Sequence, residues 1–223
     1  NTGRQLFVDD FLIAQTDLAR TFHTATKYEG NPVFKPTTPE EFAASSRGEQ
    51  GQKAVCYLGH GGVFFDPAEG LVKMWYTAGW RGPLALATSK DAFHWERPLA
   101  GLTNNVVLPA ASAGGDNCVW FDTLTANPAE RVKFLADRGS LGHTVRVSPD
   151  GRTWSRDVPV GHAGDYCSFF FNPFRNAWVY SVKRGSSHGR CRDYAESPLF
   201  LTEGAANNSV YWCNADRLDD QDA

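Results

Sequence analysis

The alternation of apolar and polar positions along this chain repeats three times. Short apolar runs at 62–66, 119–122 and 168–172 each end at an Asp or Asn and lead into a turn that contains proline. A second apolar run follows each turn and ends at a glycine, namely Gly79, Gly139 and Gly185. This pattern predicts paired antiparallel strands in three successive units.

The spacing of the units matches the size of a propeller blade. From Asp66 to Asp122 is 56 positions, and from Asp122 to Asn172 is 50. That interval fits four short strands with their loops. The sequence therefore predicts an all-β fold, a β-propeller of four-stranded antiparallel blades, with residues 1–223 as one domain.

Three blades do not complete the ring of about four to eight blades that propellers form. Flanking strands are predicted at 5–14, 21–28 and 208–214, and the polar segment 35–52 is predicted to be a long loop. An open ring leaves sheet edges exposed. Missing C-terminal blades, a small ring closed by the flanking strands, or self-association with another chain would each cover them.

A second motif recurs at the third strand of the first two units. Segments 89–95 and 148–154 share Ser, Asp and Trp at identical spacing. We expect Asp91 and Asp150 to accept hydrogen bonds from backbone N–H groups of equivalent turns, and Trp95 and Trp154 to be buried between sheets. The third unit lacks this Asp and Trp, which is a reason to look for a site there.

Segment 185–189 matches the Gly-x-Ser-x-Gly motif of serine hydrolases. That motif requires a strand, a sharp turn and then a helix. Here it joins two predicted strands, so we expect a simple hairpin.

Composition narrows the class of partner. Hydrophobic residues at 42% and charged residues at 21% indicate a folded chain, and no apolar run approaches the roughly 18 residues of a membrane span. A net charge of -3 without a basic cluster argues against a nucleic-acid surface and favours a small neutral partner. The chain starts at Asn1 rather than Met and shows no signal peptide, although one could have been removed, and we expect a secreted or periplasmic protein.

The cysteines carry no metal signature. Five are present, without a Cys-x-x-Cys pair or histidines at zinc spacing: Cys56, Cys118, Cys167, Cys191 and Cys213. The sequence leaves open whether these cysteines are buried thiols or include a disulfide. Because their number is odd, at least one has no disulfide partner within the chain. We expect neither a metal nor a cofactor.

Two aspartates stand at the predicted start of an innermost strand, where propeller blades converge on the axis. Asp116 and Asp165 share the context Gly-Asp-x-Cys, and His60 occupies the corresponding point of the first unit. Two carboxylates around one pocket are what glycoside hydrolysis requires, one as acid and the other as base or nucleophile. The alternative is that each Asp only accepts backbone N–H groups at a strand entrance.

These residues carry a resemblance. Segments 73–77, 87–91 and 94–96, the opening 6–10, and the two aspartates resemble the five-bladed propeller glycosidases of glycoside hydrolase families 32 and 43 and their bacterial relatives. The resemblance implies five blades when complete and a carbohydrate substrate from a plant, algal or bacterial glycan. It also implies three catalytic acids on different blades, for which Asp116, Asp165 and Glu196 are the candidates.

Substrate-binding candidates surround these acids: Asp10, His60, Trp80, Tyr166 and Arg192. The aromatic rings could stack on sugars, although aromatics in blade strands also form cores. Asp10 could lie in a turn, and Glu196 could be a solvated charge. A non-catalytic propeller that binds glycan or protein is the competing class. Catalysis predicts two carboxylates facing one pocket, whereas a binding module predicts aromatics and amides there.

Overall fold

The structure, a computed structural model, describes residues 10, 13–43, 54–99, 103–187 and 189–214. The chain divides into two compact units, Asn1–Asn31 and Pro32–Ala223. No helix among the residues described has the length and apolar character needed to cross a membrane. The expectation of a single domain over 1–223 stays a prediction.

In the N-terminal unit, Asn1–Asn31, the described residues contain no strand, so the prediction of a strand at 21–28 is wrong. Residues of this segment favour extended backbone, but a strand is stable only when a neighbour pairs with its backbone and covers its side chains. Phe22 is 83% exposed and Tyr28 is 53% exposed. The predicted strand at 5–14 lies largely outside the described residues.

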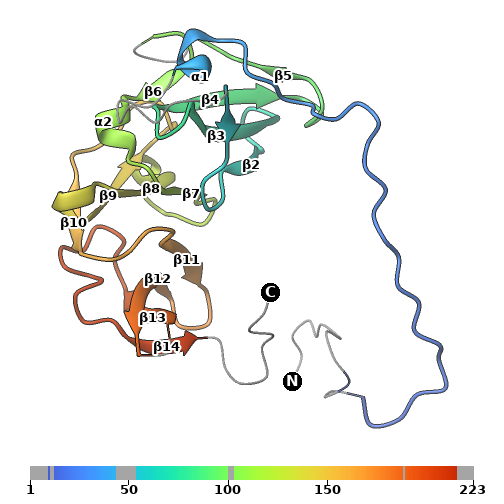
Figure 1. Ribbon diagram of the computed structural model, residues 1–223, viewed down its shortest axis with the longest axis vertical. Coiled ribbons are helices and arrows are strands. Elements are labelled where there is room, and N and C mark those ends of the chain that lie inside the picture. Colours follow the sequence, from blue (N-terminus) through green and yellow to red (C-terminus); the bar gives the residue numbers. More distant parts are fainter. Residues whose placement is uncertain (1–9, 11–12, 44–53, 100–102, 188, 215–223) are drawn as a thin grey trace. The chain divides into compact units, whose positions relative to one another are not determined.

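All-β architecture is confirmed in the larger compact unit, Pro32–Ala223, which holds three antiparallel sheets (Figure 1). The first sheet contains β1 (Cys56–Tyr57), β2 (Val63–Asp66), β3 (Leu71–Ala78), β4 (Leu84–Ser89), β5 (Trp95–Glu96) and β6 (Val106–Leu108). Because β1 and β2 both pair with β3, and β5 and β6 both pair with β4, this sheet has four strand positions.

The other two sheets have four strands in chain order. One is β7 (Asn117–Phe121), β8 (Val132–Asp137), β9 (His143–Ser148) and β10 (Val158–Gly161). The other is β11 (Ser168–Asn172), β12 (Ala177–Ser186), β13 (Gly189–Ser197) and β14 (Val210–Asn214). The repeat and the C-terminal strand predicted at 208–214 are thereby confirmed.

The helical elements are all short. They are α1 (Pro39–Phe42), α2 (Ala110–Ala113), and the 3-10 turns η1 (Pro128–Glu130) and η2 (Gly139–Leu141). The expectation of a loop over 35–52 therefore missed α1. This helix is held by Glu41, whose buried carboxylate accepts hydrogen bonds from Arg97 and from the Tyr76 hydroxyl. Burial alone would raise the pKa of Glu41, but these bonds and two from backbone N–H groups lower it to about 2.

Two apolar cores lie between successive sheets. Leu84 and Leu86 of the first sheet pack with Phe134 of the second, and Leu135 and Val145 of the second lie in one cluster with Trp178 of the third. The first strands of the first and second sheets are neighbours, since His60, between β1 and β2, forms a parallel bridge with Cys118, and the His60 N–H donates to the carbonyl of Asn117 at 2.8 Å. Their equivalent ends therefore lie on the same side.

The Ser, Asp and Trp motif forms equivalent turns, as predicted. Asp91 Oδ1 accepts the N–H groups of residues 93 and 94, and Asp150 Oδ1 accepts those of residues 152 and 153. The burial predicted for the two tryptophans is only partly right. Trp154 is half-buried against Phe134 in the core between two sheets, whereas Trp95 packs on Phe34, because the segment after Pro32 covers that face of the first sheet.

Segment 185–189 is the predicted hairpin: Ser186 pairs with Gly189 across the turn, and position 188 lies outside the described residues. The five cysteines are free thiols. Of these, Cys118, Cys167 and Cys191 are buried, Cys56 is half-buried and Cys213 is exposed.

Candidate functional site

Two of the three predicted acids, Asp116 and Asp165, lie at the start of first strands. Asp116 directly precedes β7, Asp165 precedes β11 by three positions, and His60 lies between β1 and β2. The Gly-Asp-x-Cys segments are not in strict register, because Asp116 to Asp122 spans 6 positions and Asp165 to Asn172 spans 7. Tyr166, with a left-handed φ of 56°, follows Asp165 where the longer segment enters its sheet.

Asp116 has an environment that favours its protonated form. Its half-buried position is the largest cause of a raised pKa, and the negative charges of Asp137 and Asp165 add to the effect. The positive charge of Arg81 opposes the rise, as does His60 to a smaller extent. The charge of Asp165 is thus one of the groups that raise the pKa of Asp116.

Asp165 has the opposite environment. Its Oδ1 accepts a hydrogen bond from Lys183 Nζ, and this contact is the main cause of a lowered pKa, with smaller contributions from the charges of Lys183 and Arg190. The side chain is 40% exposed, which also favours ionisation. The environment of Asp116 therefore favours the neutral carboxyl, and the environment of Asp165 favours the charged carboxylate.

Three further candidates lie beside the acids. The rings of His60 and Tyr166 meet edge to face with centroids 5.3 Å apart, and Arg192 Nη1 donates to the backbone oxygen of Tyr166 at 2.7 Å. Burial, followed by the charge of Arg192, lowers the pKa of His60 and favours the neutral imidazole. Its buried Nε2 has no hydrogen-bond partner in the described part of the chain.

Trp80 is linked to the site by a ring contact with Tyr57. The two rings have centroids 5.8 Å apart, the Tyr57 hydroxyl donates to the carbonyl of Gly115 at 3.1 Å, and Arg81 N donates to the Tyr57 oxygen at 3.2 Å. Trp80 is 36% exposed. It is thus an accessible ring anchored next to the residue that precedes Asp116.

Arg81 and Tyr166 share an unusual backbone. Both have φ above +50° without being glycine, a conformation that costs about 1–2 kcal/mol and is concentrated at functional sites. Sequence analysis identified Tyr166 but not Arg81, Tyr57, Lys183 or Asp137. The Gly-Trp-Arg-Gly turn after β3 is the only signal that could have indicated Arg81.

The structure does not bring Glu196 to this group. Glu196 pairs with Val179 on β12, whereas Lys183 of the site pairs with Arg192. These pairs are four positions apart, which corresponds to about 13 Å along a strand. The Glu196 carboxylate is bound by Arg175 through two contacts of 2.6 and 2.8 Å, which lowers its pKa.

Asp10 belongs to the N-terminal unit, where it forms an ion pair with Arg20. Nothing in that unit tests its predicted role in substrate binding.

Two hollows lie in this region, and Asp165 lines the first of them. A pocket of about 380 Å³ is lined by Asp165, Tyr166, Lys183, Arg190, Cys191, Arg192, Cys213 and Asn214. A groove of about 600 Å³ follows the first strands along 58–64, 118–120 and 168–170. Among the residues described, no three His, Cys, Asp or Glu side chains are grouped so as to hold a metal ion. The site therefore offers carboxylates, cationic groups and aromatic rings.

The chain matches no protein-family model and no curated protein sequence. Among solved structures it is similar to a fructofuranosidase from Schwanniomyces occidentalis complexed with fructose, with 16% identity, a TM-score of 0.46, and coverage of 67% of this chain and 32% of that chain. It is also similar to an N-acetylgalactosamine deacetylase from F. plautii, with 14% identity, a TM-score of 0.48, and coverage of 78% and 55%.

A third similar structure is an alpha-L-arabinofuranosidase from Podospora anserina, with 14% identity, a TM-score of 0.46, and coverage of 66% of this chain and 49% of that chain. The chain thus spans 32 to 55% of the length of these three proteins. At this low identity, the solved structures to which it is similar include a fructofuranosidase and an arabinofuranosidase, glycosidases of the kind that the sequence resembles.

Proposed function

We propose that this chain carries the axial site of a glycoside hydrolase-like propeller, with Asp116 as general acid and Asp165 as base or nucleophile. The observation that carries the proposal is the opposite shift of their two pKa values, raised for Asp116, in part by the charge of Asp165, and lowered for Asp165. Paired carboxylates whose environments separate their pKa values divide the acid and base roles of glycoside hydrolysis.

In this mechanism, protonated Asp116 donates to the glycosidic oxygen as the bond to the leaving sugar breaks. Asp165, kept ionised by Lys183, either activates water or attacks the sugar carbon. The neutral imidazole of His60 is suited to hydrogen-bond a sugar hydroxyl, and Trp80 and Tyr166 offer exposed rings to the apolar faces of sugars. Glu196, which resemblance made a candidate acid, has no part in this mechanism.

The proposal extends to the architecture. The three sheets are consecutive blades of a propeller that has five blades when complete, and their first strands line its axis. Two features support this: each first strand is at an edge of its sheet, and the first strands of the first two sheets are bridged in parallel. The groove along 58–64, 118–120 and 168–170 is then a part of the axial channel.

Hydrolysis of a panel of plant, algal and bacterial polysaccharides, measured as released reducing sugar, tests the function. We expect Asp116→Asn and Asp165→Asn each to lower the rate by about 100-fold or more, because each removes one proton-transfer or nucleophilic role. Glu196→Gln is the matched control and should retain activity. Thermal unfolding of each variant shows whether the fold is intact.

Full activity in both aspartate variants would reject the assignment. Glycan binding by the unmodified protein without any hydrolysis would instead favour a carbohydrate-binding module. The exposed rings of Trp80 and Tyr166 beside the acids are compatible with that second function.

A further inference from the structure

A row of basic side chains crosses the third sheet beside Asp165. Lys183 of β12 is directly paired with Arg192 of β13, which in turn is paired with Cys213 of β14. Arg190 lies two positions from Arg192 and therefore on the same face of β13. Like charges that face each other across strands destabilise a sheet. The row thus has a cost in stability that a bound anion would offset.

Only part of this positive charge is neutralised within the described residues. Lys183 forms its ion pair with Asp165, whereas Arg192 donates to the neutral backbone oxygen of Tyr166. No ion pair is formed by Arg190 or Arg192 in the part of the chain that the structure describes. The pocket wall therefore has three cationic side chains against one carboxylate, although the whole chain has a net charge of -3.

The pocket has room next to these groups. Arg190 is paired with Gly185, and no atom lies within 4 Å of the place where a side chain on Gly185 would begin. The pocket measures about 380 Å³. Arginine guanidinium groups present two parallel N–H donors that match the oxygens of a carboxylate or sulfate.

The pocket also adjoins the proposed catalytic site through Asp165 and Tyr166. Asp165 and Tyr166 line the pocket, and Tyr166 is in ring contact with His60 of the axial site. An anionic group bound here would thus belong to the same glycan that reaches Asp116 and Asp165.

We propose that this pocket binds an acidic substituent of the glycan, the carboxylate of a uronic acid or a sulfate ester, through Arg190 and Arg192. The inference rests on the proposed function for the identity of the ligand as a glycan. It replaces the neutral partner expected from net charge with an anionic one, because local charge rather than net charge decides what a pocket attracts.

Binding of D-glucuronate, D-glucose 6-sulfate and D-glucose, measured by NMR titration of the unmodified protein at low and high salt, tests the proposal. We expect at least one acidic sugar to bind about tenfold or more tightly than glucose, as a charge-assisted hydrogen bond would provide. Added salt should weaken the binding of the acidic sugars and leave that of glucose unchanged. The two acidic sugars distinguish carboxylate from sulfate recognition.

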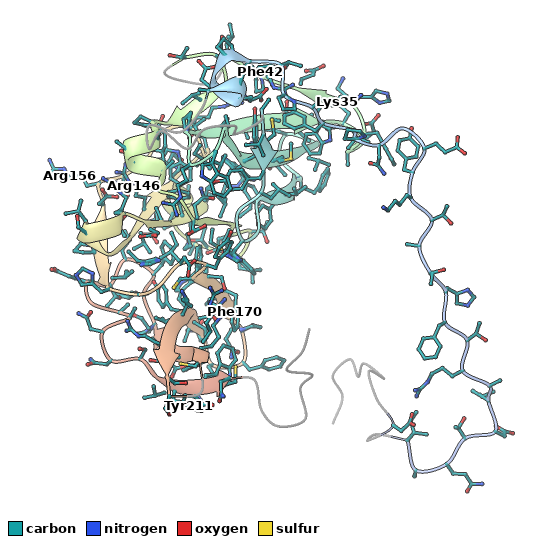
Figure 2. All side chains as sticks on the ribbon, in the orientation of Figure 1. Lys35, Phe42, Arg146, Arg156, Phe170 and Tyr211 are labelled. Carbon is teal, nitrogen blue, oxygen red and sulfur yellow. The ribbon has the colours of Figure 1, made fainter. Side chains whose placement is uncertain are left out.

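Arg190→Gln should remove most of this preference. The matched control is Arg156→Gln, another exposed arginine, in the connection between β9 and β10 and far from Tyr211 of β14 (Figure 2). Equal affinity for acidic and neutral sugars in the unmodified protein, or an equal effect of the two arginine variants, would overturn the proposal.

Failure of this inference is distinguishable from failure of the proposed function. The titrations are repeated in Asp116→Asn, which lies outside the pocket wall. Retained preference for the acidic sugar there supports the pocket whether or not hydrolysis is observed. Loss of hydrolysis in that variant, with no acidic preference in any variant, would support the catalytic proposal and reject the pocket.

Discussion

Asp116 and Asp165 share the local sequence Gly-Asp-x-Cys, yet their environments are opposite. The difference comes from burial, which raises the pKa of Asp116, and from residues distant in the chain: Asp137 raises the pKa of Asp116 further, and Lys183 lowers that of Asp165. Since a carboxyl pKa follows burial and nearby charge rather than its sequence neighbours, identical motifs acquire different roles.

Arg81 provides a test at the scale of one residue. Its positive charge opposes the raised pKa of Asp116, so Arg81→Gln should raise that pKa further. If protonated Asp116 is the general acid, activity falls as pH rises through this pKa, and the alkaline limb of the pH profile should move to higher pH. NMR titration of the side-chain carboxyl carbons measures the same shift without activity.

The acidic limb serves as an internal control for this variant. It depends on ionised Asp165, whose pKa is lowered mainly by Lys183, and it should stay in place. A movement of the alkaline limb to lower pH would contradict the assignment of Asp116.

At the scale of elements, the two Ser, Asp and Trp turns carry different residues directly after the Asp. The residue after the Asp is left-handed in both, with φ of 63° at Ala92 and 73° at Gly151. Glycine adopts this backbone without strain, and alanine does not. A side chain on Gly151 would also approach Trp75 Cζ2 at 2.3 Å.

Reciprocal substitutions of these residues should have opposite effects on stability. We expect Ala92→Gly to raise the free energy of unfolding by up to about 1 kcal/mol, because it relieves the left-handed backbone. Gly151→Ala should lower it by about 1–3 kcal/mol through overpacking against Trp75. Urea denaturation measures both, and a stabilised Gly151→Ala protein would show that the turn is not built as described.

The buried ion pairs at the first turn of the first two sheets form a second natural comparison. Asp66 binds Lys73 and Asp122 binds Lys133, both at 2.8 Å, with Lys73 and Lys133 side chains 2% exposed. In the third sheet the equivalent positions are Asn172 and Val179, so both charges are absent together. A buried charge without its partner is costly, which explains the joint replacement.

Lys133→Met should lower the free energy of unfolding by about 3–5 kcal/mol, since it leaves Asp122 buried and unpaired. The double variant Asp122→Asn with Lys133→Val, which copies the third sheet, should be less destabilised than Lys133→Met. Exposed Lys90→Met is the control, with an expected change within about 0.5 kcal/mol. Denaturant titration decides the order, and a double variant less stable than the single one would contradict this account.

At the scale of the whole molecule, cores shared between sheets make each sheet depend on its neighbour. Trp178 of β12 is 5% exposed and contacts Trp120 of β7 edge to face at 6.3 Å between centroids. Its ring also packs on Phe169 of β11 and on Phe200 in the connection between β13 and β14.

Trp178→Ala should therefore destabilise the second and third sheets together, by about 3–5 kcal/mol, because it opens a cavity in their common core. Chemical unfolding followed by both fluorescence and circular dichroism should show one earlier transition. Two separate transitions in the unmodified protein would mean that the sheets fold independently. Phe174→Ala, at a 98% exposed position in a turn, is the control.

Sequence alone was sufficient for the strands and turns of the three sheets. Their signals are local: alternating apolar residues, a turn after Asp66, Asp122 or Asn172, and the Asp91 and Asp150 turns. Each of these depends on backbone conformation and hydrogen bonds within a few residues. The predicted strand at 21–28 was wrong because strand formation also needs a partner, which local pattern does not supply.

Sequence also indicated most members of the candidate site, since His60, Asp116 and Asp165 occupy related places in a repeat. Tertiary structure decided which acids have neighbours that give them distinct pKa values, and it separated Glu196, four pairs along the hairpin, from Lys183 and Arg192. It also brought Arg81 and Tyr57 of the first sheet to Asp116 of the second. Side-chain electrostatics depend on distances between sheets, and those distances are set by packing rather than by the order of residues in the chain.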